Sequence, residues 1–241
     1  MHANGSGIHR AFGELAAREA LRDLAALVWP VTCVGCGAAD RELCARCMAE
    51  LRDAVPSTVT SALAGVPAYA RGPYAGVLRR VIVAYKHGER AGFARILGEQ
   101  LAHPLARAIA HAYTRPLLIA APSRAAQVRR RGFRHVEAAL RVACGGVPDP
   151  ATPVRALRST RGRQGQVGLD AATRAENAAR IAVRSGYRRK LRGREVILID
   201  DIMTTGATVL AARRALTAAG ARVVAVAVLA AVTYEGTPED S

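Results

Sequence analysis

Residues 196–208 read Val196-Ile-Leu-Ile-Asp-Asp-Ile-Met-Thr-Thr-Gly-Ala-Thr208, and they carry the strongest structural signal in this chain. The four leading apolar residues predict a strand that is buried on both faces, as in parallel sheets. Two carboxylates follow, at the end of the strand where open α/β sheets bind their ligands. The hydroxyl-rich turn then leads into a helix expected over 207–219, whose first amides favour a phosphate. The stretch therefore predicts an anion site between a strand and a helix.

The two acids need polar surroundings, because like charges cannot both be buried without a partner. We expect at least one of Asp200 and Asp201 to face ligand groups such as sugar hydroxyls, while Gly206 lets the loop approach a phosphate closely. The alternative is a strand that ends in an Asp-Thr turn, with Thr204 or Thr205 acting only as a helix cap. The order of apolar run, acid pair and threonine turn in a strand-turn-helix context favours the binding site.

The rest of the larger segment, about 66–234, alternates strand-like and helix-like patterns. This alternation predicts an α/β domain with a mostly parallel sheet flanked by helices. We expect strands at 117–121, 153–157, 195–199 and 222–232, and helices at 91–112, 133–143 and 207–219. The helix over 91–112 should end at Arg115-Pro116. Residues 158–170 show no period and are either a mobile functional loop or an ordinary connection.

The N-terminal region, residues 1–31, has a polar start followed by an amphipathic helix over 15–29. Charges interrupt that helix, so it predicts neither an export signal nor a membrane span. The longest apolar run, 223–232, is about half of the roughly 20 residues that cross a bilayer. We therefore expect a cytoplasmic protein without membrane insertion. In that compartment paired cysteines hold metal more often than they form disulfides.

Residues 32–60 contain Cys33, Cys36, Cys44 and Cys47, which form two Cys-x-x-Cys pairs. Four thiolates at this spacing can surround a tetrahedral Zn²⁺. So short a segment also needs a cross-link, such as a bound metal ion, in order to fold. We expect a structural zinc module, with an iron–sulfur cluster or redox-active thiols as the alternatives. Cys144 stands apart on an apolar helix and is expected in the core.

Positive charge is concentrated in one third of the chain. The formal net charge is +16, and residues 115–194 alone hold 19 Arg and Lys residues against 4 Asp and Glu residues. This surplus indicates an anionic partner, or a charged surface that only keeps the protein soluble.

The stretch 196–208 resembles the signature of type I phosphoribosyltransferases, which bind 5-phosphoribosyl-1-pyrophosphate (PRPP). The resemblance implies that Asp200 and Asp201 hold the ribose 2′- and 3′-hydroxyls. It also implies a cradle for the 5′-phosphate, made of Thr204, Thr205, Gly206, Ala207 and Thr208. Mg²⁺ would be held largely by the oxygens of PRPP itself and by water. The implied reaction transfers phosphoribose to a nitrogen acceptor and releases pyrophosphate.

Together with the cysteine pairs, the pattern over about 28–232 resembles the ComF family of competence-associated proteins with a phosphoribosyltransferase domain. Shorter pieces in the same order are Tyr85-Lys86-His87-Gly88, Ala121-Pro122-Ser123, Arg130-Arg131-Gly132-Phe133 and a Gln166 to Asn177 segment. The resemblance implies that the loop over 122–133 grips pyrophosphate and that residues 158–174 form a lid. The candidate pyrophosphate residues are Ser123, Arg124, Arg129, Arg130 and Arg131. Their alternative role is a surface arginine cluster.

The chain departs from the family at Arg134-His135, where Asn-Gln is usual, and at Arg163, where Thr is expected. These departures affect the pyrophosphate loop and the lid. No histidine spacing predicts a metal site, so we expect surface or structural roles for the histidines. A second hypothesis is a non-catalytic PRPP- or nucleotide-binding adaptor on single-stranded DNA, and a third is that the zinc module docks a DNA-processing helicase. The aromatic content of 4% gives few rings for base stacking.

Overall fold

The computed structural model describes residues 31–39, 41–59, 63, 65–87, 90, 92–147, 153–160 and 181–232. The chain divides into two compact units, Met1–Glu50 and Leu51–Ser241. The helix expected over 15–29 and most of the expected lid lie outside the described residues, and the domain limits expected from the sequence stay predictions.

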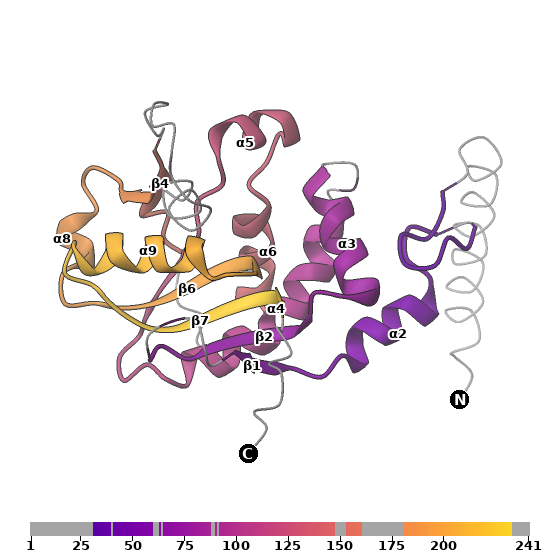
Figure 1. Cartoon of the computed structure of the whole chain (residues 1–241), viewed down its shortest axis with the longest axis horizontal. Coiled ribbons are helices and arrows are strands. Elements are labelled where there is room, and N and C mark those ends of the chain that lie inside the picture. Colours follow the sequence, from indigo (N-terminus) through magenta and orange to yellow (C-terminus); the bar gives the residue numbers. More distant parts are fainter. Residues whose placement is uncertain are drawn as a thin grey trace, which may run out of the picture. The chain divides into compact units, whose positions relative to one another are not determined.

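The larger unit is built on a five-stranded sheet (Figure 1). In spatial order its strands are β1 (Ser57–Val59), β2 (Ala68–Pro73), β7 (Arg222–Ala231), β6 (Glu195–Met203) and β3 (Leu117–Ala120). Only β1 runs antiparallel to its neighbour, and the other three pairings are parallel. The predicted α/β fold with a mostly parallel sheet is therefore confirmed.

Helices cover both faces of this sheet (Figure 1). On one face α4 (Phe93–Ile109) packs against β2 and β7, and it also contacts α3 (Gly76–His87) and α6 (His135–Cys144). On the other face lies α9 (Ala207–Thr217). Its buried side chains join a core cluster with alternate residues of the strands, because successive side chains of a strand point to opposite faces.

A smaller two-stranded sheet consists of β4 (Leu157–Ser159) and the antiparallel β5 (Ile181–Val183). It contacts α9 through β5, and α8 (Arg188–Leu191) follows it in the chain. The strand expected at 153–157 is wrong in its position. Pro153 makes only an isolated bridge to Leu118, and the regular strand begins at Leu157.

Several other elements match or extend the sequence-based expectations. The strand at β3, the strand at β7 and the helix at α6 lie within two residues of their predicted limits. Strand β6 is longer than expected, because its pairing with β7 continues to Met203 opposite Ala231. Helix α4 ends at Ile109, ahead of the Arg-Pro pair that we expected to end it. None of the described helices has the length and apolar character that a membrane crossing requires.

A buried arginine fixes the end of α2 (Ala45–Asp53). Arg71 of β2 is 2% exposed, and its Nε donates to Oε1 of Gln100 on α4 at 2.8 Å. Its Nη2 donates to the carbonyl oxygens of Leu51 at 2.8 Å and Arg52 at 2.6 Å, and its Nη1 donates to that of Ala54. Burial lowers the pKa of Arg71. These acceptors satisfy a buried charge that would otherwise be costly.

Candidate functional site

The acid pair lies at the carboxyl edge of the sheet. Ala120, the last residue of β3, pairs with Ile199, so Asp200 and Asp201 extend past the end of β3. Both acids are part of β6, although we expected them to follow the strand. Because side chains alternate along a strand, the two carboxylates point to opposite faces of the sheet.

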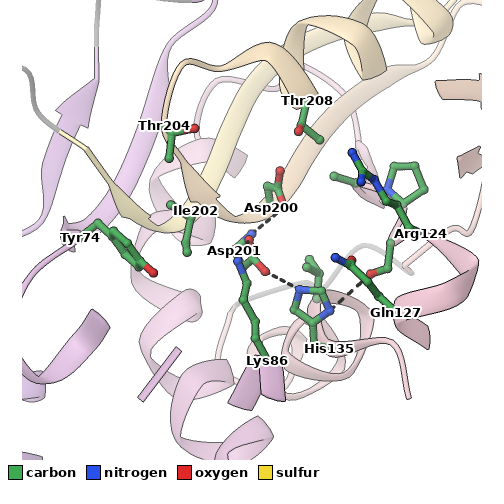
Figure 2. A pocket seen from close by; sticks show the side chains of 14 residues that line it. Tyr74, Lys86, Arg124, Gln127, His135, Asp200, Asp201, Ile202, Thr204 and Thr208 are labelled. Carbon is green, nitrogen blue, oxygen red and sulfur yellow. Dashed lines mark hydrogen bonds and ion pairs between the residues drawn. The ribbon is translucent and has the colours of Figure 1, made fainter. Parts of the chain in front are cut away.

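Asp201 points towards α3 and α6 and is 8% exposed (Figure 2). The Nζ atom of Lys86, on α3, lies 3.0 Å from its Oδ1 atom, and Nε2 of His135, on α6, contacts its Oδ2 atom. Burial alone would raise the pKa of Asp201, but the hydrogen bond from His135 and the charge of Lys86 lower it to about 2. Asp201 is therefore ionised at neutral pH.

Asp200 points to the face that α9 covers and is 9% exposed. Its Oδ1 atom accepts the backbone N–H of Asp201 at 2.8 Å. Burial and the neighbouring charge of Asp201 raise the pKa of Asp200 to about 8. The pair therefore favours one negative charge over two at neutral pH.

The turn after β6 leads directly into α9. Gly206 has φ of +73°, a left-handed conformation that glycine adopts without steric cost, and it precedes the first residue of the helix. Thr204, Thr205 and Thr208 are exposed. Thr205 Oγ1 accepts only a long hydrogen bond, 3.4 Å, from the N–H of Ala207. The turn thus presents hydroxyls and helix-start amides, which suit a phosphate better than a plain helix cap.

A pocket of about 350 Å³ joins the acid pair to this turn (Figure 2). Its volume is within the range of small-molecule sites. It is lined by Tyr74, Lys86, Ala121, Pro122, Ser123, Arg124, Gln127, His135, Val136, Asp200, Asp201, Ile202, Thr204 and Thr208. The strand, the turn and the loop after β3 therefore meet at one cavity.

The loop after β3 contains a short helix that we did not predict, α5 (Ala125–Arg131), which ends at Gly132 with φ of +79°. Ser123 and Arg124 precede it and line the pocket. Arg129 and Arg130 are exposed and are not among the lining residues of that pocket. Arg131 reaches His135 instead, with 3.0 Å between Nη1 and Nδ1. The five candidate pyrophosphate residues are thus divided between the pocket wall and its surroundings.

Two functional candidates were not identified as site residues from the sequence. His135, expected to have a surface or structural role, is 6% exposed and contacts Asp201. Lys86 appeared only within a short piece of family resemblance. No spacing rule connects either residue to the acid pair, because the contact joins positions 66 residues apart in the case of His135. The sequence signal for Lys86 was its place in a piece that resembles the ComF family. The signal for His135 was its place where the chain departs from that family.

The four predicted metal ligands come together in the smaller unit. All four Sγ atoms lie within 4.8 Å of one another, and those of Cys36 and Cys44 are 3.6 Å apart. A tetrahedral zinc with bonds of about 2.3 Å requires sulfur–sulfur distances of about 3.8 Å. Gly37, with φ of +80°, shapes the first turn, and the N–H of Cys44 donates to Cys33 Sγ at 3.3 Å. The cluster therefore fits a tetrahedral metal ion.

The thiols of Cys33 and Cys47 differ in their pKa values. Burial opposes ionisation of Cys33, but backbone N–H groups, led by that of Cys44, lower its pKa to about 6. Burial and hydrogen bonds with the other thiols raise the pKa of Cys47 to about 12. Cys144 is buried in α6, as predicted, and is not part of the cluster.

Part of the chain that contains the acid pair and the turn is similar to a known domain family. Residues 154–240 match the phosphoribosyl transferase domain family. The matched part contains β6, α9 and β7, and so includes the whole threonine turn. Residues 154–240 are thus similar to a phosphoribosyltransferase domain.

A solved structure described as the allosteric regulatory enzyme of purine biosynthesis is similar at 21% sequence identity, with a TM-score of 0.34. The alignment covers 56% of this chain and 25% of that protein, so this chain corresponds to a quarter of its length. No curated protein matches the chain.

Proposed function

We propose that this chain binds PRPP in the pocket of Figure 2 and transfers its phosphoribosyl group to a nitrogen acceptor. The observation that carries the proposal is the meeting of Asp200, Asp201, Thr204 and Thr208 at one cavity. The domain match over 154–240 includes all four residues and supports the same ligand.

In this proposal the sugar phosphate lies across the end of β6. Asp200 and Asp201 accept hydrogen bonds from the ribose 2′- and 3′-hydroxyls, and residues 204–208 bind the 5′-phosphate through hydroxyls and amides. The oxygen-rich pocket suits Mg²⁺, which would be held mainly by PRPP and water and would neutralise diphosphate charge. The two carboxylates then lie beside the ring carbon that becomes cationic.

The diphosphate is expected on the opposite wall of the pocket. A nitrogen–C1 bond forms as the C1–oxygen bond breaks, and pyrophosphate leaves with the bonding electron pair. Ser123 and Arg124 would contact the leaving group directly, with Arg131 beside them. The exposed Arg129 and Arg130 would add longer-range attraction. Such prearranged charges stabilise a transition state without later reorganisation.

Calorimetry with PRPP and Mg²⁺ tests the assignment. The double variant Asp200→Asn/Asp201→Asn should lose detectable PRPP binding, because neither amide reproduces a carboxylate acceptor pair. The matched control is Glu99→Gln, which neutralises an exposed carboxylate on α4 that pairs with Arg95. Unchanged PRPP affinity in the double variant refutes the proposal. Pyrophosphate release across purine, pyrimidine and amine acceptors then identifies the nucleophile.

We also propose that the four-cysteine cluster holds structural Zn²⁺. The sulfur spacing supports tetrahedral coordination, and a fully thiolate ligand set suits a closed structural site. The ComF resemblance supports a link to DNA uptake, with nucleotide salvage as the other setting, and a helicase as the docking partner of the zinc module.

A second candidate function is a non-catalytic adaptor on single-stranded DNA. It is favoured by a surface pocket of about 590 Å³ beside the small sheet. This pocket is lined by Arg155, Arg158, Arg184, Ser185 and Tyr187. Guanidinium groups suit phosphates, and an aromatic ring offers a stacking surface for a base.

A salt series separates the two functions. An adaptor should bind an oligonucleotide with an affinity that falls steeply with salt and does not respond to PRPP. Arg155→Gln/Arg184→Gln should weaken that binding, while Arg95→Gln, which changes an exposed arginine of α4 outside this pocket, should not. Undiminished DNA binding by the double variant, or efficient pyrophosphate release by the wild type, counts against the adaptor.

A further inference from the structure

His135 lies between the two sides of the candidate PRPP pocket (Figure 2). Its Nε2 atom contacts Oδ2 of Asp201, on the proposed ribose side. Its Nδ1 atom is 3.0 Å from Nη1 of Arg131 and 3.3 Å from Oγ of Ser123, on the proposed diphosphate side. The ring is thus the shared neighbour of residues from β6 and from the loop after β3.

The position of the ring proton follows from its neighbours. A guanidinium group only donates hydrogen bonds, so Nδ1 of His135 must be the acceptor from Arg131. The proton of the neutral ring is then on Nε2, where it is donated to the ionised carboxylate of Asp201. The hydrogen bonds therefore run in one direction, from Arg131 through the ring to Asp201.

The surrounding side chains restrict movement of the ring. The hydroxyl of Tyr85 donates to the carbonyl oxygen of His135 at 2.9 Å, and the Tyr85 ring packs edge-on against the imidazole, with centroids 6.2 Å apart. Phe133 packs on the same tyrosine, with centroids 5.2 Å apart. Lys86 engages the other oxygen of Asp201 at 3.0 Å. A carboxylate held on both oxygens has a defined orientation, and His135 supplies one of its two constraints.

We propose that His135 is a positioning residue that couples the diphosphate side of the pocket to the ribose side. It orients Asp201 through Nε2 and responds to Ser123 and Arg131 through Nδ1. A diphosphate that engages Arg131 or Ser123 changes the donor at Nδ1, and the imidazole transmits this change to the carboxylate. This inference rests on the proposed PRPP site but assigns a distinct role, which is energetic coupling between two subsites.

The test uses ribose 5-phosphate and inorganic pyrophosphate as separate probes, along with PRPP, on the full chain with Mg²⁺. Asn at position 135 places its amide near the Nδ1 position, and Gln places its amide near the Nε2 position. His135→Gln should keep the donor to Asp201 and stay within about threefold of wild-type PRPP affinity. His135→Asn and His135→Ala should bind PRPP roughly tenfold to a hundredfold more weakly, as expected for a lost hydrogen bond to a charged group.

Coupling is measured as the change in ribose 5-phosphate affinity on adding pyrophosphate. We expect an effect of about fivefold or more in the wild type and a clear loss of it in all three variants. If His135 had only a structural role, His135→Gln would change the PRPP affinity and the coupling together. It would not keep the affinity and lose the coupling. Arg131→Met provides a test outside the buried ring, because it removes the donor to Nδ1 and should also reduce the coupling.

The outcomes distinguish the two levels of the proposal. A wild-type chain that does not bind PRPP overturns the proposed function and this inference with it. A wild-type chain that binds PRPP, with coupling that is unchanged in His135→Gln and in Arg131→Met, overturns the inference alone. Equal PRPP affinities of His135→Asn and His135→Gln also contradict it, because the contact to Asp201 would then have no energetic role.

Discussion

Asp200 and Asp201 are bonded neighbours that the fold places in different surroundings. Asp201 meets a lysine and a histidine, whereas Asp200 has the backbone N–H of Asp201 as a partner. Their pKa values are therefore driven apart, to about 8 for Asp200 and about 2 for Asp201. Ligand hydroxyls that donate to Asp200 favour its ionised form, so binding them should release a proton at neutral pH.

The raised pKa of Asp200 predicts a pH-dependent stability. Between its ordinary pKa of 3.8 and about 8, the folded chain holds one proton that the unfolded chain releases. The free energy of unfolding should therefore fall as pH rises in this range, by up to about 1.4 kcal/mol per pH unit. Asp200→Asn removes this dependence, so thermal unfolding should show its greatest relative stabilisation near pH 8 and almost none near pH 4.

Asp201→Asn is the matched comparison and should behave in the opposite way. The lowered pKa of Asp201 stabilises the fold above its ordinary value of 3.8, and that stability is lost as pH falls towards 2. At neutral pH the variant should therefore be less stable than the wild type. If wild type and Asp200→Asn give parallel melting temperatures across this pH range, the burial of the Asp200 carboxylate is wrong.

At the residue scale, the sequence predicted the side chains that are contiguous in the chain. The acid pair and Thr204 to Thr208 form one strand-turn-helix unit, so their proximity follows from local geometry. Lys86 and His135 reach the same pocket from α3 and α6, through packing of helices that no local pattern specifies. Their assignment required the three-dimensional structure.

At the scale of the elements, α4 and α6 are in close contact at Gly98. A Cβ atom at this position would lie 2.4 Å from Cβ of Val142 and 2.7 Å from the carbonyl oxygen of Ala139. Both neighbours belong to α6, and the second is backbone that cannot rotate away. The absence of a side chain at Gly98 therefore sets the distance between the two helices, and α6 carries His135.

Gly98→Ala should destabilise the protein. Alanine favours a helix by up to about 1 kcal/mol relative to glycine, but overpacking in a core typically costs about 1–3 kcal/mol. We expect the steric cost to dominate and chemical denaturation to show a lower free energy of unfolding. Ala106→Gly, at an exposed position of the same helix, should cost no more than about 1 kcal/mol. A Gly98→Ala variant as stable as the wild type would contradict this close helix contact.

The elements that the sequence predicted share a strong local signal. The apolar runs of β3 and β7 correspond to buried parallel strands, whose continuous hydrophobicity is distinctive. Strand β2 reads Ala-Tyr-Ala-Arg-Gly-Pro, a composition with little strand preference. It becomes a strand because β7 pairs with it, so the tertiary context overrides the weak strand propensity of these residues.

For the whole molecule, the two units have different sources of stability. The larger unit has an extensive apolar core between sheet and helices, whereas the described part of the smaller unit contains the cysteine cluster. The cysteine spacing was readable from the sequence because the four ligands lie within 15 consecutive residues. The basic pocket beside β5 could not be predicted from the sequence, because its lining residues lie on both sides of the segment 161–180.

Metal analysis tests the smaller unit. The purified chain should contain about one zinc ion, and Cys47→Ser should lose most of it, because three remaining thiolates bind zinc less tightly. Cys144→Ser, which changes a buried cysteine outside the cluster, should keep its zinc. Equal zinc in the two variants would show that the ion binds elsewhere, and iron with labile sulfide would replace the zinc assignment by a cluster.

The hydrogen bonds of Arg71 limit which amino acids can replace its partners. If Gln100 became apolar, the Nε–H group of Arg71 would lose its side-chain acceptor, and if Arg71 became apolar, the carbonyl oxygens of Leu51, Arg52 and Ala54 would lose their donor. Either single change passes through a less stable intermediate. Positions 71 and 100 should therefore covary in related sequences, with an arginine at 71 accompanied by a hydrogen-bond acceptor at 100.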